Sequence, residues 1–275
     1  MPMDATSRHL KASLSGYKGI PIKMKHIDLR IDNVIDIKQG GKTMNTKYEF
    51  TGATKRVNGV TLHRIRALKD FGEIRKGDIG GWIEAERNLS IYNTAWVFGQ
   101  AQVYGNAFVA EGATVDDKAQ IRDNASIYGN ACIYNEAQVY GNARIFGEAQ
   151  LSDCCHVCGY AAIGGSVCIS DDAYITHIAT IIGNARIGKN ALIFNNTDFF
   201  TIEGQLGSYF RYTTFFKDNH DNIFVACGCF RGTINEFRRA VKEKHGTTSK
   251  QARAYQAAAD LAEIQLYKNV PTQDI

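Results

Sequence analysis

The middle of the chain repeats its apolar residues with a period of six. Alanine occupies every sixth position from 95 to 149, and the same phase extends from Leu89 to Ala191. Valine, isoleucine or leucine stands two positions after each of these sites, from Ile91 to Ile193. A helix needs a period near 3.6 and a strand alternates by two. The period of six therefore predicts four strand residues followed by a corner of two residues.

Residues 89–196 form 18 consecutive hexads with no insertion between them. The two apolar positions of each hexad are expected to point inward. The corner is often Gly-Asn, and both of these residue types tolerate positive φ. Three sides of six residues make one coil of 18, and successive coils stack at the spacing of paired strands. The repeat predicts a mainly β fold, a single-stranded parallel β-helix of about six triangular coils.

Both ends of such a column need caps, because the terminal coils expose unpaired strand edges. Residues 47–88 predict an N-terminal β-hairpin cap with a tight turn at Asn58 and Gly59. Residues 1–46 have no clear period and are expected to be an N-terminal extension.

The C-terminal segment, residues 197–275, predicts an α+β cap. Its first part has the pattern of a hairpin around residues 217–222. A capping-box pattern opens at Thr233 and predicts a helix that Gly246 ends, and a second helix is expected from about Ser249.

The repeat resembles the hexapeptide-repeat superfamily, whose fold is a left-handed parallel β-helix; residues 97–101, Val-Phe-Gly-Gln-Ala, form one such unit. The hairpin, the segment Gly77–Glu84 and the hexads together resemble the YdcK-type members over about residues 47–196. The resemblance implies left-handed coils. It also implies a phage or prophage origin, since related sequences are common there. An inhibitor of a bacterial defence system would fit that origin. The transferase label that this family carries rests on fold analogy.

Composition narrows the class of protein further. No apolar run approaches the roughly 18 residues that span a bilayer, and the N-terminus lacks the apolar block of a secretory signal. We therefore expect a cytoplasmic protein that does not enter a membrane. Seven cysteines, an odd number outside a secretory context, are expected to be reduced thiols. The net charge of +4 is too small to indicate a nucleic-acid partner.

Acyl transfer is one candidate function, because many hexapeptide-repeat enzymes use a histidine base in a groove between neighbouring prisms. The hexads contain two histidines, His156 on a flat side and His177 at a corner. General base catalysis needs such a group positioned at the hydroxyl or amine to be acylated. However, the hexads contain no inserted loop, whereas those enzymes often build their site from one. If the protein is an acyltransferase, these two histidines are its candidate catalytic residues, and the donor is an acyl-CoA-like thioester.

Metal binding is a weaker candidate. Cysteines cluster around His156, but the phase turns Cys155 into the core, so buried or packed thiols are the better interpretation there. Cys227 and Cys229 lie in the second predicted strand of the C-terminal hairpin. Both thiols would point to one side of that strand and could pair with His220 or His245. No cofactor is predicted.

Binding through a side of the solenoid is the leading hypothesis, because stacking by 18 aligns aromatic residues with arginine. One side brings Tyr104, Arg122 and Tyr140 onto successive coils, and the adjacent side aligns Tyr128, Arg144 and Phe146. Such residues suit a protein contact, for example with a host protein, or stacking on a small nucleotide-like ligand. The alternative is that the rings form ladders that only stabilise the solenoid or its self-association.

The sequence thus predicts a non-catalytic β-solenoid that binds a partner, with an acyltransferase as the alternative. A homo-oligomer is expected, and the pattern leaves dimer and trimer open. The candidate contact residues for self-association are outward-facing and apolar: Phe108, Phe146, Ile182 and Phe194.

Overall fold

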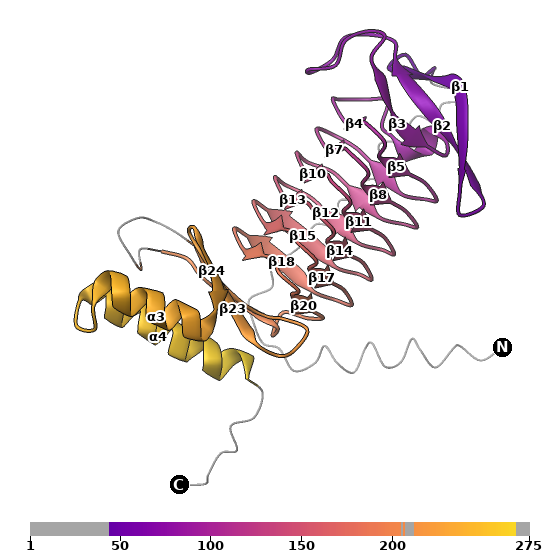
Figure 1. Ribbon diagram of the computed structural model, residues 1–275. Coiled ribbons are helices and arrows are strands. Elements are labelled where there is room, and N and C mark those ends of the chain that lie inside the picture. The colour runs from indigo at the N-terminus through magenta and orange to yellow at the C-terminus, as the bar shows by residue number, and fades with distance from the viewer. Residues whose placement is uncertain (1–43, 205, 207–211, 268–275) are drawn as a thin grey trace, which may run out of the picture. The chain divides into compact units, whose positions relative to one another are not determined.

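The computed structural model describes residues 44–204, 206 and 212–267. The described residues from Asn45 onward form one compact unit, which contains the solenoid and its two caps (Figure 1). The predicted N-terminal extension lies outside the described residues, apart from positions 44–46.

The hexads form three faces of stacked parallel strands, as predicted. The first face contains β5 (Gln102–Val103), β8 (Gln120–Ile121), β11 (Gln138–Val139), β14 (His156–Val157), β17 (Tyr174–Ile175) and β20 (Leu192–Ile193). The second face contains β6 (Phe108–Val109), β9 (Ser126–Ile127), β12 (Arg144–Ile145), β15 (Ala162–Gly165) and β18 (Thr180–Gly183). The third face contains β4 (Trp96–Val97), β7 (Thr114–Val115), β10 (Cys132–Ile133), β13 (Gln150–Leu151), β16 (Cys168–Ile169) and β19 (Arg186–Ile187).

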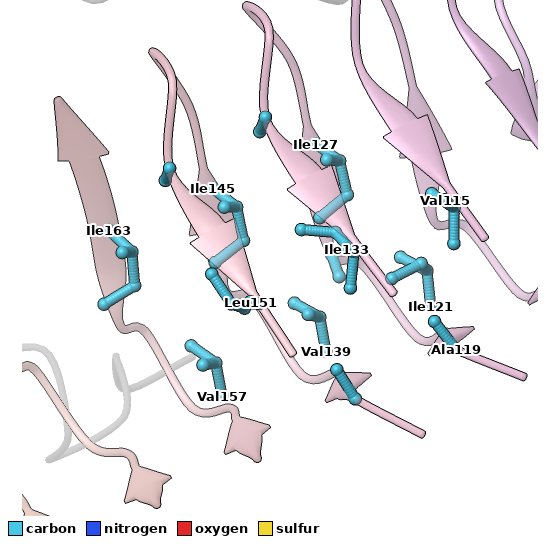
Figure 2. Packing of buried hydrophobic residues seen from close by; sticks show 14 of the residues in the cluster. Val115, Ala119, Ile121, Ile127, Ile133, Val139, Ile145, Leu151, Val157 and Ile163 are labelled. Carbon is cyan, nitrogen blue, oxygen red and sulfur yellow. The ribbon is translucent and has the colours of Figure 1, made fainter. Parts of the chain in front are cut away.

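The register of every strand pair in these faces is 18 residues. Val139 of β11, for example, pairs with Ile121 of β8 and with Val157 of β14. Identical positions therefore stack, and the inward aliphatic side chains of all three faces meet in one apolar interior (Figure 2). From Val97 to Ile193 these side chains are at most 2% exposed. Burial of this continuous apolar column is the main stabilising contribution.

The corners adopt left-handed backbone conformations. Glycines fill one corner column, where Gly129, Gly147 and Gly165 have φ between 70° and 74°. Another column carries Asp153 and Asp171, with φ near 55°. Asp and Asn visit this region more readily than most residues, so the corners need no glycine at every coil.

The N-terminal cap extends the first face. Strands β1 (Tyr48–Val57) and β2 (Val60–Ala67) form the predicted hairpin, and β2 pairs antiparallel with β3 (Ile79–Ile83). Strand β3 then pairs parallel with β5, so the hairpin and the first face belong to one nine-stranded sheet.

The first predicted hexad, residues 89–94, does not form a regular strand. Leu89 makes an isolated bridge to Val109, and Ile91 is only half-buried. The 3-10 helix η1 (Glu86–Asn88) precedes residues 89–94. Within these residues, the carbonyl oxygens of Ser90 and Tyr92 accept hydrogen bonds from the buried Lys47 side chain. The first hexad therefore departs from the register of the coils that follow, because the cap rather than another coil covers it.

The C-terminal cap contains a four-stranded antiparallel sheet, larger than the predicted hairpin. Its order is β21 (Phe199–Ile202), β22 (Thr213–Lys217), β23 (Ile223–Cys227) and β24 (Phe230–Thr233). The predicted second strand, residues 223–230, divides into two because Gly228, with φ of 60°, begins a tight turn. An isolated bridge between Ala191 and Asp218 joins this sheet to the last coil.

Two helices complete this cap as predicted. Helix α3 (Ile234–His245) begins with the capping box of Thr233 and Glu236. Helix α4 (Lys250–Leu266) begins at Ser249, whose hydroxyl accepts a hydrogen bond from the Ala252 amide. Both helices pack on Phe215 and Val225 of the sheet and form a second apolar core.

Candidate functional site

The outward side chains of the first face form a continuous stack over several coils. The guanidinium group of Arg122 lies 4.0 Å from the centre of the Tyr140 ring. His156, one coil further, meets Tyr140 edge-on at 6.2 Å between ring centres and stacks on Tyr174 at 5.8 Å. The 18-residue register places Tyr140 above Arg122 and Tyr174 above His156, in two neighbouring columns of the face. The contact between Tyr140 and His156 joins the two columns.

Hydroxyl groups tie the two tyrosines of this stack together. The hydroxyls of Tyr140 and Tyr174 are 3.2 Å apart, and the Cys158 thiol beneath them lies 3.5 Å from the Tyr174 hydroxyl. Burial, followed by these hydrogen bonds, raises the pKa of Tyr140. Its phenol therefore stays protonated and can donate a hydrogen bond at neutral pH.

His156 is held as a neutral imidazole. Its burial between the rings lowers its pKa, the nearby Arg122 lowers it further, and Asp172 opposes the shift. Its Nδ1 atom is buried and makes no hydrogen bond within the described structure. A neutral imidazole at this position can donate or accept a hydrogen bond without carrying charge.

A groove runs beside this stack, along the edge between the third and first faces. One part of about 520 Å³ is lined by the glutamine column of the first face and by His156. A second part, of about 620 Å³, lies over the corner itself. The two parts share four lining residues: Gln100, Lys118, Glu136 and Cys154. Lys118 and Glu136 form an ion pair of 2.8 Å across this shared wall. The sequence pattern did not indicate the groove, because the corner residues that form one of its walls have no common type.

Tyr104 does not belong to the exposed stack, although it shares its column. Its side chain is only 6% exposed, and its hydroxyl accepts a hydrogen bond of 3.3 Å from Asn58 at the hairpin turn. The N-terminal cap therefore covers it. The expectation that Tyr104 is an outward contact residue was wrong, because the hexad phase does not show what packs over the first coils.

The second face carries the other predicted set. Tyr128 and Phe146 stack nearly parallel, with ring centres 5.5 Å apart, and Arg144 donates a hydrogen bond of 3.1 Å to the Tyr128 hydroxyl. Phe146 also lies over Gly164, where an added Cβ would come within 2.2 Å of its ring. These three residues thus form a ladder within the face.

His177 and His156 differ in setting. His177 occupies a corner with φ of 54°, and its ring meets Phe194 edge-on at 4.9 Å. His156 instead lines the groove on the flat first face.

The predicted metal residues of the C-terminal cap lie in different settings. Cys227 ends β23, where its sulfur lies 3.2 Å from the Thr213 hydroxyl. Cys229 is in the turn and not in a strand, so the alignment of the two thiols expected from a single strand was wrong. His245 packs against Tyr255, with ring centres 5.8 Å apart. Across the described part of the chain, no group of three or more His, Cys, Asp or Glu side chains is arranged to hold a metal ion.

The repeated coils, the three faces and the two caps define a β-solenoid protein. A family model described as the YdcK Beta solenoid repeat matches residues 137–153, a stretch that contains one strand of each face, β11, β12 and β13. The chain is therefore similar to YdcK-type solenoids in this repeat. No curated protein matches it. No helix in the described ranges combines the length and apolar composition needed to cross a membrane.

Proposed function

We propose that the protein is a non-catalytic β-solenoid that binds a partner protein through its first face. The observation that carries this proposal is that the stack of Arg122, Tyr140 and Tyr174 adjoins the groove through His156, which belongs to both. Aromatic side chains and arginine supply most of the energy at protein interfaces. The adjacent groove adds hydrogen-bonding amides from the glutamine column.

The rigidity of the stack supports a binding role. Arg122 is held by the Tyr140 ring and by an ion pair of 3.1 Å with Asp123. The hydroxyls of Tyr140 and Tyr174 hold each other in place. Side chains that are ordered before binding lose little conformational entropy on association. The groove adjoins the first face, so the second face is the less favoured surface.

The origin and target of the protein are further parts of the proposal. A phage-borne chain acting on a host protein, such as a component of a bacterial defence system, is what the YdcK-type resemblance implies. The cytoplasm is the compartment in which such a partner would be met. The match in the repeat supports the solenoid class alone.

A pair of triple variants tests which face binds. Arg122, Tyr140 and Tyr174 are replaced by alanine in one variant, and Tyr128, Arg144 and Phe146 in the other. Proteins retained from a bacterial lysate by the tagged wild type are identified by mass spectrometry, purified and titrated calorimetrically against all three forms. We expect the first variant to weaken binding at least tenfold and the second to leave it unchanged.

Two results would contradict the proposal. If both triple variants bind the purified partner as the wild type does, the partner docks elsewhere. If the second variant alone loses binding, the site is on the second face. Circular dichroism and the denaturation midpoint of each variant separate loss of binding from loss of folding.

Acyl transfer is the second candidate, and the position of His156 favours it. The neutral imidazole lines a groove of about 520 Å³ and could serve as a general base. Incubation with acetyl-CoA and a panel of amine and hydroxyl acceptors measures this activity as released thiol. The acyltransferase hypothesis expects His156→Ala to abolish thiol release and His177→Ala to retain it. If the wild type releases thiol no faster than a protein-free control does, these acceptors are excluded as substrates.

A further inference from the structure

Helix α4 carries an apolar ridge on its exposed side. Its opposite side is buried, with Ala259, Ala262 and Leu266 in the second core. Toward the C-terminal end, by contrast, Leu261 is 42% exposed and Ile264 is 70% exposed. The two residues are three positions apart and therefore lie next to each other on the helix surface. Large aliphatic side chains exposed together in this way indicate an interaction surface.

The N-terminal half of the same exposed side forms a shallow groove. The groove has a volume of about 720 Å³, and its lining includes the small residues Ala254 and Ala257. The charged residues Lys250, Arg253 and Asp260 line it as well. One helix thus presents a ridge of large side chains and, one to two turns away, a groove whose lining includes small ones.

We propose that α4 pairs antiparallel with α4 of a second copy of this chain, around a two-fold axis near Ala257. Lys250, Ala257 and Ile264 are spaced by seven residues, which keeps them on one seam of a helix pair. Antiparallel pairing about Ala257 places Ile264 of the partner subunit opposite Lys250, and Leu261 of the partner subunit opposite the groove. Each ridge then fills the groove of the other copy.

Charge favours this orientation. The cations Lys250 and Arg253 lie in the first turns of the helix, whereas the acids Asp260 and Glu263 lie toward its C-terminal end, where Asp260 also lines the end of the groove. Arg238 of α3 pairs with both of these acids, at 2.7 Å and 2.9 Å, and leaves the ridge half with one net negative charge. An antiparallel pair brings the basic half of one helix against the acidic half of the other. A parallel pair would bring the two basic halves together.

A second copy is the occupant that this surface fits, because both complementary halves belong to the same helix. An isologous interface requires such self-complementarity: if a residue contacts a second residue, the same contact recurs with the subunits exchanged. A single helix from each subunit buries less than the roughly 1,600 Å² of a standard interface. The dimer is therefore expected to dissociate on dilution.

Sedimentation velocity of the full chain over a concentration series tests the proposal. We expect the wild type to shift from monomer to dimer as concentration rises. Ile264→Lys places a cation opposite Lys250 of the partner subunit and should weaken the dimer at least tenfold. Gln265→Lys adds a positive charge at the neighbouring exposed position, off the seam, and should leave the dimer intact. A wild type that stays monomeric at the highest concentration overturns the proposal, as does an assembly on which the two variants have equal effects.

A cysteine at the axis tests the register. In an Ala257→Cys variant, the two introduced thiols would face each other across the two-fold axis, close enough to form a disulfide. Small residues at this position let the two helix axes approach to about 8 Å. We expect mild oxidation to convert this variant to a covalent dimer. Gln265→Cys and the wild type, which already exposes Cys154 and Cys229, should not be converted. Equal cross-linking of all three proteins, or of none, would contradict the antiparallel register.

Discussion

The Nζ atom of Lys47 lies 2.6 Å from the carbonyl oxygen of Ala95, inside the first coil of the solenoid. The same atom lies 3.0 Å and 3.3 Å from the carbonyl oxygens of Ser90 and Tyr92. The equivalent of the Ala95 carbonyl one coil further on, that of Ala113, accepts a hydrogen bond from the amide of Trp96 on the preceding coil. At Ala95 the lysine therefore supplies the donor that a preceding coil would have supplied.

This lysine should make the stability of the protein depend on pH. Burial lowers the pKa of Lys47 from 10.5 to about 7. The unfolded chain therefore binds more protons than the folded chain between these two values, and the free energy of unfolding rises with pH across that window. From pH 7 to pH 9 the increase is about 2 kcal/mol.

Chemical denaturation of the wild type and of Lys47→Met at both pH values measures this effect. The variant removes the titrating amine, so the difference in unfolding free energy between the two proteins should grow by that amount. At pH 9 the variant should be less stable by about 2 kcal/mol or more, because buried carbonyls lose their donors. A difference that is constant or shrinks as the pH rises would show that the ammonium group stays charged in the folded state.

Gly81 should be essential to the junction between the N-terminal cap and the first coil. A Cβ atom at this position would lie 2.7 Å from the carbonyl oxygen of Phe98 and 2.8 Å from that of Ala101. Backbone atoms cannot move aside without breaking the coil, so we expect Gly81→Ala to lower the unfolding free energy by about 3 kcal/mol.

Gly112→Ala is the matched control for this substitution. Its nearest contact is the side-chain oxygen of Asn130, which can rotate away. The expected loss is below about 1 kcal/mol. Equal denaturation midpoints for the two variants would mean that β3 moves freely relative to the first coil.

The solenoid could be predicted from the sequence because its contacts are periodic. A residue always stacks on the residue 18 positions away, so the type of residue at each position reports directly on its environment. Val139, for example, meets Ile121 and Val157 by register alone. The same logic predicted that Arg122 and Tyr140 lie together on one face.

The contacts that close the column could not be predicted in this way. Lys47 reaches Ala95 across 48 positions, and no pattern in the sequence marks it as a buried residue. Tyr104 has the outward phase of an exposed residue, yet the hairpin turn at Asn58 covers it. These contacts join residues far apart in the sequence and depend on how the cap packs over the first coils. The position of a residue within its hexad does not predict that packing.

Asp171 should stabilise the stacking of corners. Its carboxylate accepts a hydrogen bond of 2.6 Å from the backbone amide of Lys189, one coil further on. Asp171→Ala removes this acceptor and also places alanine in the left-handed region, at φ of 55°. We expect a loss of about 2 kcal/mol in unfolding free energy. Asp171→Asn keeps an acceptor oxygen and tolerates that conformation, so its midpoint in urea should stay close to that of the wild type. Equal losses for Ala and Asn would attribute the effect to the negative charge instead.

The imidazole of His156 should respond in opposite directions to its two charged neighbours. Burial lowers its pKa below the ordinary 6.5, Arg122 lowers it further, and Asp172 raises it. Arg122→Ala should therefore move the pKa upward, and Asp172→Ala should move it downward. Titration of the ring proton by NMR in the three proteins measures both shifts. Because the folded-state pKa is lowered, the contribution of His156 to stability is complete above pH 6.5 and is lost as the pH falls from there through the lower folded-state pKa. A pKa that moves in the same direction in both variants would show that rearrangement of the Tyr140 and Tyr174 rings, rather than charge, determines the protonation of His156.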